Sequence, residues 1–99
     1  MAKLSNKNAS TSFHGTTIRT TVSKLEQAIG QAQGIYNSGD DKTNYDWDCE
    51  TEDGDVFTIY DWKEYRPIGS NEMIEFHIGG ETKSITEQAK RELLAILNN

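Results

Sequence analysis

A chain of 99 residues has the length of one small domain, and only 34 % of its residues are apolar, so the core it can build is modest. The formal net charge of −6 disfavours a nucleic-acid backbone as the main partner, and the single cysteine excludes an internal disulfide framework. No charged-then-apolar leader and no membrane-spanning apolar run is present, so we expect a cytoplasmic protein without membrane contact.

The beginning of the chain predicts an arm followed by a strand. Residues 1–12 are small and polar, and we expect a flexible N-terminal arm or an edge that orders late. A single α+β domain is expected over residues 13–99. Residues 13–20 are rich in β-branched side chains, which favours a strand with a bulge at Gly15.

Two capping boxes, each a serine followed three residues later by a glutamate, predict two helices. The first is expected to begin after Ser23 as N-cap and to end near Gly34. The second is expected to begin after Ser84 and to run to about Leu97. Both carry apolar residues at helical spacing, so each should bury one face.

The clearest pattern is a strict alternation over residues 45–52, which predicts a strand with one apolar and one acidic face. A two-residue turn after it would put Phe57 on the acidic face. A three-residue loop with Gly54 in the left-handed position sets Cys49 opposite Phe57 instead, and burial favours that register. The core face of the hairpin then consists of Tyr45, Trp47, Cys49, Phe57 and Ile59.

A further strand is expected over residues 72–78, with Gly79 and Gly80 breaking it. Residues 35–43 and 64–71 have the composition of loops. The predicted order is β-α-β-β-β-α, a mostly antiparallel sheet with two helices packed on one face.

The segment FTIYDWKEYR (57–66), followed by IEFHIGG (74–80), resembles small accessory proteins of tailed bacteriophages. The upstream GDDKT (39–43) and Trp47 fit the same pattern, and the resemblance covers roughly residues 34–90. It implies a context rather than a chemistry, because accessory proteins of this size often inhibit or sequester a component of host immunity.

Aromatic side chains and an arginine gather after the second hairpin strand: Tyr60, Trp62, Tyr65 and Arg66. Such a set is what a base-stacking surface or a protein hot spot requires. Alternatively, this face packs under the first helix or against another subunit, since self-association is a normal way for a small chain to bury aromatic area.

Gly79 and Gly80 precede the second helix, with Lys83 beside them. Free backbone N–H groups, a positive helix end and a lysine suit a phosphate or another anion, while a plain strand-to-helix turn is the alternative. His77 is expected either to bond a neighbouring carboxylate or to contribute to the ligand site.

Catalytic and metal-binding residues are not expected. His14, His77 and one inward-facing cysteine do not supply a zinc ligand set. The carboxylates between Asp40 and Asp55 do not have the spacing of a calcium loop and predict a solvated edge and turn. No nucleophile elbow occurs, and no cofactor is expected.

The sequence therefore favours a non-enzymatic phage protein, acting in the host cytoplasm, that counters a host defence. In the leading hypothesis a homo-oligomer sequesters a small anionic, cyclic-nucleotide-like signal. Its ligand-binding residues would be Tyr60, Trp62, Tyr65, Arg66, His77, Gly79, Gly80 and Lys83. The alternative is a direct inhibitor that docks on a host defence protein through its acidic and aromatic hairpin face. A structural or assembly protein of the virion is the third possibility.

Overall fold

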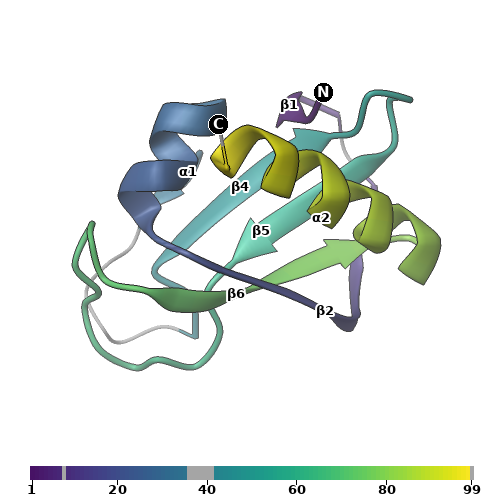
Figure 1. Cartoon of the computed structure of the whole chain (residues 1–99). Helices are drawn as coiled ribbons and strands as arrows, with labels where there is room; N and C mark the ends of the chain where they lie inside the picture. The colour runs from purple at the N-terminus through teal and green to yellow at the C-terminus, as the bar shows by residue number, and fades with distance from the viewer. Residues whose placement is uncertain (8, 36–41, 99) are drawn as a thin grey trace.

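The computed structural model describes residues 1–7, 9–35 and 42–98. Within these ranges the elements are β1 (Lys3–Leu4), β2 (Ser12–Thr20), α1 (Val22–Ile29), β3 (Gly34–Ile35), β4 (Tyr45–Glu50), β5 (Val56–Tyr60), β6 (Ile74–Gly80) and α2 (Lys83–Leu97). One antiparallel sheet forms in the order β1-β4-β5-β6-β2, and β3 pairs with β4 off this path. Figure 1 shows both helices on the same side of the sheet. The predicted α+β class is confirmed.

The hairpin of β4 and β5 has the predicted register. Cys49 pairs with Phe57. The backbone N–H of Thr51 donates to the carbonyl of Asp55 at 2.9 Å, which leaves a three-residue loop. Gly54 in this loop has φ +85°, the left-handed conformation that glycine adopts without a steric penalty. The strict alternation of the sequence and the demand for burial were therefore sufficient to determine the pairing.

The core lies between the inner face of the sheet and the two helices. The inner-face side chains of β4, β5 and β6 are fully or almost fully buried: Trp47, Cys49, Phe57, Ile59, Ile74, Phe76 and Ile78. Leu25 of α1 and Ala89 and Leu93 of α2 cover them. Tyr45 is partly buried and packs against this cluster. In the described part of the chain, no helix is long and apolar enough to cross a membrane.

In both helices the N-cap lies two residues before the predicted one. Thr21 caps α1, since its hydroxyl accepts from the backbone N–H of Lys24 at 3.0 Å. Thr82 caps α2 in the same way, accepting from the N–H of Ile85 at 3.2 Å. Ser23 and Ser84 therefore lie inside the first helical turn. Threonine and serine are both good N-caps, and the capping boxes did not distinguish two candidates so close together.

The first helix ends earlier than predicted. It stops at Ile29, and the N–H of Gly30 donates to the carbonyl of Glu26 at 2.9 Å. Gly30 has φ +111°, so it serves as the terminating glycine in place of Gly34. Gly34 lies in β3, and so does Ile35, which was expected to begin a loop. Residues 36–41 of that predicted loop lie outside the described residues, and residues 42–43 belong to no helix or strand, as expected.

The predicted N-terminal arm is not free at its beginning. Lys3–Leu4 forms β1 and pairs with Glu50 and Cys49 of β4. Ala2 and Ser5 are buried, and the N–H of Ser5 donates to the carbonyl of Asp48 at 2.9 Å. The unpaired edge of β4 explains this outcome, because a sheet edge leaves backbone donors and acceptors that a short extended segment can satisfy.

At the other edge of the sheet, β2 carries the predicted bulge. The pairing of β2 with β6 shifts between Phe13 and Thr17, around Gly15. The bulge allows the first residues of β2 to change their orientation relative to the regular part of the strand.

Candidate functional site

The outer face of the sheet, opposite the helices, carries a row of polar and aromatic side chains. Asp46, Tyr60 and His77 are direct neighbours across β4, β5 and β6, and Thr17 of β2 pairs with His77 on the other side. All four are intermediate in exposure. Figure 1 shows no described helix over this face.

Four rings lie against one another on this face, and we call Phe13, Tyr60, Trp62 and His77 the aromatic platform. Phe13 stacks on His77 with ring centroids 4.0 Å apart and planes 15° apart. Trp62 stacks on the imidazole at 6.2 Å and 30°. The edge of Tyr60 meets both, at 5.9 Å from Trp62 and 5.5 Å from His77. Each such pair contributes about 0.5–1.5 kcal/mol beyond burial.

The four rings of the platform differ in their exposure to solvent. Phe13 remains 44 % exposed and Trp62 39 % exposed, whereas Tyr60 and His77 are half-buried. Burial lowers the pKa of His77 below its usual value, with Glu75 opposing the shift, and burial raises the pKa of Tyr60. Both groups are therefore uncharged at neutral pH, which suits them to stacking.

Two lysines flank the indole of Trp62. The ammonium groups of Lys42 and Lys63 each lie 5.7 Å from its ring centroid. Their backbones are in contact, since the N–H of Lys63 donates to the carbonyl of Lys42 at 2.7 Å. Among the described residues, neither lysine forms an ion pair with a carboxylate. The platform therefore has two cations beside Trp62, one of its two exposed rings.

A buried carboxylate fixes the segment that carries Trp62. Asp61 is fully buried, and its Oδ1 accepts from the backbone N–H groups of Asn44 and Tyr45 at 2.8 and 2.9 Å. Its Oδ2 accepts from the side-chain amide of Asn44 at 3.0 Å. That amide also donates to the carbonyl of Arg66 at 2.9 Å, which closes the loop after β5.

The same loop contains two non-glycine residues in the left-handed region, Lys63 at φ 58° and Tyr65 at φ 51°. Such conformations are uncommon for non-glycine residues and need support from surrounding contacts. Asn44 Oδ1 is buried and has no hydrogen-bond partner among the described residues, whereas the side-chain amide donor of Asn44 and both carboxylate oxygens of Asp61 are paired. The loop is therefore strongly constrained.

Next to the platform, β4 presents carboxylates on the outer face. The pKa of Asp46 is raised by burial and by repulsion from Asp48 and Asp61. Glu50 is bonded to Lys7 at 3.1 Å. Asp46 and Asp48 have no cationic partner among the described residues.

The structure brings together three of the predicted site residues, Tyr60, Trp62 and His77. It does not add Arg66 to them. The guanidinium of Arg66 forms a two-armed ion pair with Glu72, one arm of which measures 3.0 Å, and lies 3.6 Å from Glu64. Tyr65 is in the same loop, 54 % exposed, and makes no described ring contact with the platform.

The strand break expected at Gly79 and Gly80, on which the predicted anion cradle depended, is wrong. Both glycines are buried inside β6, between β5 and β2, and so they continue the strand that they were expected to break. A Cβ on Gly79 would lie 2.7 Å from Thr58 Oγ1, and one on Gly80 would lie 3.0 Å from Thr86 Cγ2. Close packing therefore explains why glycine occupies both positions. Lys83 begins α2 on the opposite side of the sheet.

The sequence patterns did not predict Phe13, Lys42 or Lys63 as site residues. Phe13 was assigned to a strand, but only the bulge brings its ring onto His77. The proximity of the two lysines could have been predicted from the hairpin. Extending its register beyond the pair Asp46–Tyr60 places the segments that contain Lys42 and Lys63 side by side.

Other candidate groups on the chain have structural roles. Cys49 is fully buried, and burial raises the pKa of its thiol well above the usual range. His14 bonds the carbonyl of Gly80 at 3.0 Å. No group of three or more potential metal ligands occurs among the described residues. Asp40 and Asp41, part of the acidic run, lie outside them.

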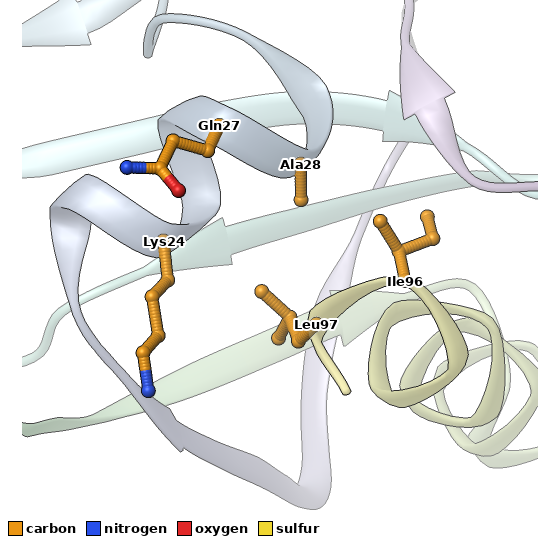
Figure 2. A pocket seen from close by; sticks show the side chains of 5 residues that line it. All are labelled: Lys24, Gln27, Ala28, Ile96 and Leu97. Atoms are coloured by element: carbon orange, nitrogen blue, oxygen red, sulfur yellow. The ribbon is translucent and has the colours of Figure 1, made fainter. Parts of the chain in front are cut away.

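A groove of about 420 Å³ lies between α1 and α2 (Figure 2). It is lined by Lys24, Gln27, Ala28, Ile96 and Leu97. The cation among these residues is Lys24, which lies beside the C-terminal end of α2. A positive charge there stabilises the helix dipole, so Lys24 has a structural role. The groove has no aromatic lining, so the platform is the better candidate for recognition of a planar ligand.

No protein-family model, curated protein or solved structure matches this chain.

Proposed function

We propose that this is a non-enzymatic binding protein that sequesters a small anionic ligand with a planar ring, of the nucleotide kind, on its aromatic platform. The observation that carries the proposal is the surroundings of Trp62: a partly exposed indole on the face opposite the helices, flanked by two lysines that have no carboxylate partner among the described residues. Stacking of a base on an aromatic side chain contributes about 1–3 kcal/mol, and the ammonium groups complement phosphate.

Sequestration fits the chemistry of the platform better than catalysis. His77 is the platform group whose pKa lies nearest neutrality, but its ring is stacked between Phe13 and Trp62. It forms none of the side-chain hydrogen bonds found among the described residues, so no third group orients it as a base. Acid–base or nucleophilic catalysis requires such an oriented partner.

The biological setting of the proposal comes from the resemblance to phage accessory proteins. A protein that binds a nucleotide without converting it lowers the free concentration of that nucleotide. We therefore take the ligand to be a signal of host defence, bound in the host cytoplasm. The exposed aromatic area supports a homo-oligomer, in which part of that area would be buried.

The test uses a bacterium with an active nucleotide-signalling defence. The protein is purified from it as wild type, Trp62→Ala and Tyr65→Ala, then heated, and released small molecules are identified by mass spectrometry. Tyr65 is the matched control, an exposed aromatic in the same loop but outside the platform. Wild type and Tyr65→Ala should release the same nucleotide and Trp62→Ala at least tenfold less. Equal release from all three would refute this site.

A second candidate function is supported by Asp46 and Asp48. These carboxylates share the uncovered face with Tyr60 and have no cationic partner among the described residues, so a basic protein surface would complement them. A direct inhibitor of this kind would co-purify with a host polypeptide and carry no small molecule. Asp46→Asn combined with Asp48→Asn should abolish that complex, while the same change should leave nucleotide release intact if sequestration is the function.

A further inference from the structure

The two lysines at Trp62 lie side by side on the backbone as well as at the ring. The hydrogen bond from Lys63 N–H to the carbonyl of Lys42 joins the segment before β4 to the segment after β5. With each ammonium 5.7 Å from one centroid, the two charges are at most about 11 Å apart. This maximum separation is close to the Debye length of about 10 Å at 0.1 M salt. Salt therefore screens the interaction between the two ammonium groups only in part.

In the free protein, no described carboxylate neutralises these two charges. The chain has 16 acidic and 10 basic side chains, yet these two neighbouring lysines have no described carboxylate partner. Among the described residues, the indole is the partner of each ammonium group, and a cation–π contact at an exposed site contributes about 0.5–1 kcal/mol. A hydrogen bond to a charged group contributes about 1.5–3 kcal/mol, so an anion would draw both ammonium groups off the ring.

The backbone below the lysines does not have to move for this. Asp61 and Asn44 tie the two segments together under the lysines, with contacts of 2.8 to 3.0 Å. The left-handed φ of Lys63 is part of that constrained loop. Only the flexible four-carbon side chains must turn, and the indole face that they leave becomes free for a ring.

We propose that Lys42 and Lys63 act as a clamp for two anionic groups on one ligand, which makes the ligand class a planar base carrying two phosphates rather than one. This rests on the proposed function and narrows it. A nucleoside diphosphate and a cyclic dinucleotide share this chemistry, since each presents two phosphate charges next to a base.

The experiment is isothermal titration of the full chain with the mono- and diphosphates of adenosine, guanosine, cytidine and uridine, and with the cyclic dinucleotides of adenosine and guanosine. For the best base, the doubly phosphorylated ligand should bind at least tenfold more tightly than the monophosphate. A cyclic dinucleotide that binds more tightly than the diphosphate identifies the source while supporting the clamp.

Lysine variants separate the clamp from general attraction. In Lys42→Gln and in Lys63→Gln, the preference for two phosphates should fall to less than threefold. Lys83→Gln is the matched control, because this exposed lysine begins α2 on the other side of the sheet, and it should keep the full preference. Thermal unfolding of each variant confirms that the fold is retained.

Two outcomes overturn the clamp in different ways. Binding that needs Trp62 but is equal for mono- and diphosphates contradicts the clamp and leaves the proposed function intact. No binding of any of these nucleotides at millimolar concentration contradicts both.

Discussion

Gly79 has no side chain to accommodate, and two threonines occupy the space above it. A Cβ there would lie 2.7 Å from Thr58 Oγ1 and 3.6 Å from Thr11 Cβ, and the two threonine hydroxyls are 3.3 Å apart. We therefore expect Gly79→Ala to lower the free energy of unfolding by about 1–3 kcal/mol, measured by urea denaturation.

Gly69→Ala is the control for this substitution, because its Cβ would have only an ordinary contact of 3.8 Å with Glu72. It should change stability by less than about 0.5 kcal/mol. In a Thr58→Ala background the cost of Gly79→Ala should fall by at least half. An undiminished cost would show that crowding by Thr58 is not the cause.

His77 makes stability depend on pH in a defined direction. Burial lowers its pKa below the usual 6.5, so the unfolded chain binds the proton more readily than the folded protein does. Stability should be fully present above pH 6.5 and should decrease as the pH falls from there through the folded pKa. Urea midpoints between pH 7.5 and 5.5 measure this.

His77→Gln should be less stable overall, because the ring contacts with Phe13, Tyr60 and Trp62 are lost, but its stability should change less across that range. Asp46, whose pKa is raised from 3.8, contributes with the opposite sign at lower pH, so the comparison stops at pH 5.5. An equally steep decrease in the variant would assign the pH dependence to another group.

At the level of elements, the loop after β5 depends on one buried carboxylate. Asp61 accepts three hydrogen bonds from Asn44 and Tyr45. Asp61→Asn would turn a donor toward the amide of Asn44 and leave buried polar groups unsatisfied. We expect a loss of about 2–4 kcal/mol in the free energy of unfolding.

Asp48→Asn is the control for Asp61→Asn. It also removes a carboxylate, but one on the outer face whose side chain takes part in none of the described hydrogen bonds, and its effect should stay within about 0.5 kcal/mol. If Asp61→Asn unfolded at the same urea concentration as Asp48→Asn, the loop would not depend on this network.

Sequence patterns predicted the hairpin better than the helix ends, for a physical reason. Alternation in β4 and β5 is enforced by burial of every second side chain, so an error of one residue would expose Phe57. A helix start is decided by one hydrogen bond of about 1 kcal/mol, and Thr21 and Ser23 are both competent to make it.

At the level of the whole molecule, local sequence patterns predict only some of the residues in the candidate site. Tyr60 and His77 follow from strand alternation and pairing, and Trp62 follows two residues after Tyr60. Phe13 and Lys42 come from distant segments, which only the assembled sheet and the loop contacts bring to Trp62.

At Gly79 and Gly80 the local pattern predicted a feature that the structure does not have. Gly79 and Gly80 look like a strand end in the sequence, because glycine usually weakens strands. Close contacts from Thr58 of the neighbouring strand β5, and from Thr86 of the helix that follows, favour glycine there instead. A single sequence contains no local sign of such contacts.

Binding at the aromatic platform is tested by following the two indole N–H signals in two-dimensional NMR during titration with the tightest-binding nucleotide. Trp47 is buried and its Nε1–H donates to the carbonyl of Gly30 at 3.0 Å, so it is an internal control, whereas Trp62 is on the platform. We expect a saturable shift of the Trp62 indole and the His77 amide signals, with the Trp47 indole signal unchanged. Saturable shifts confined to Ala28, Ile96 and Leu97, at the groove between the helices, would contradict binding at the platform.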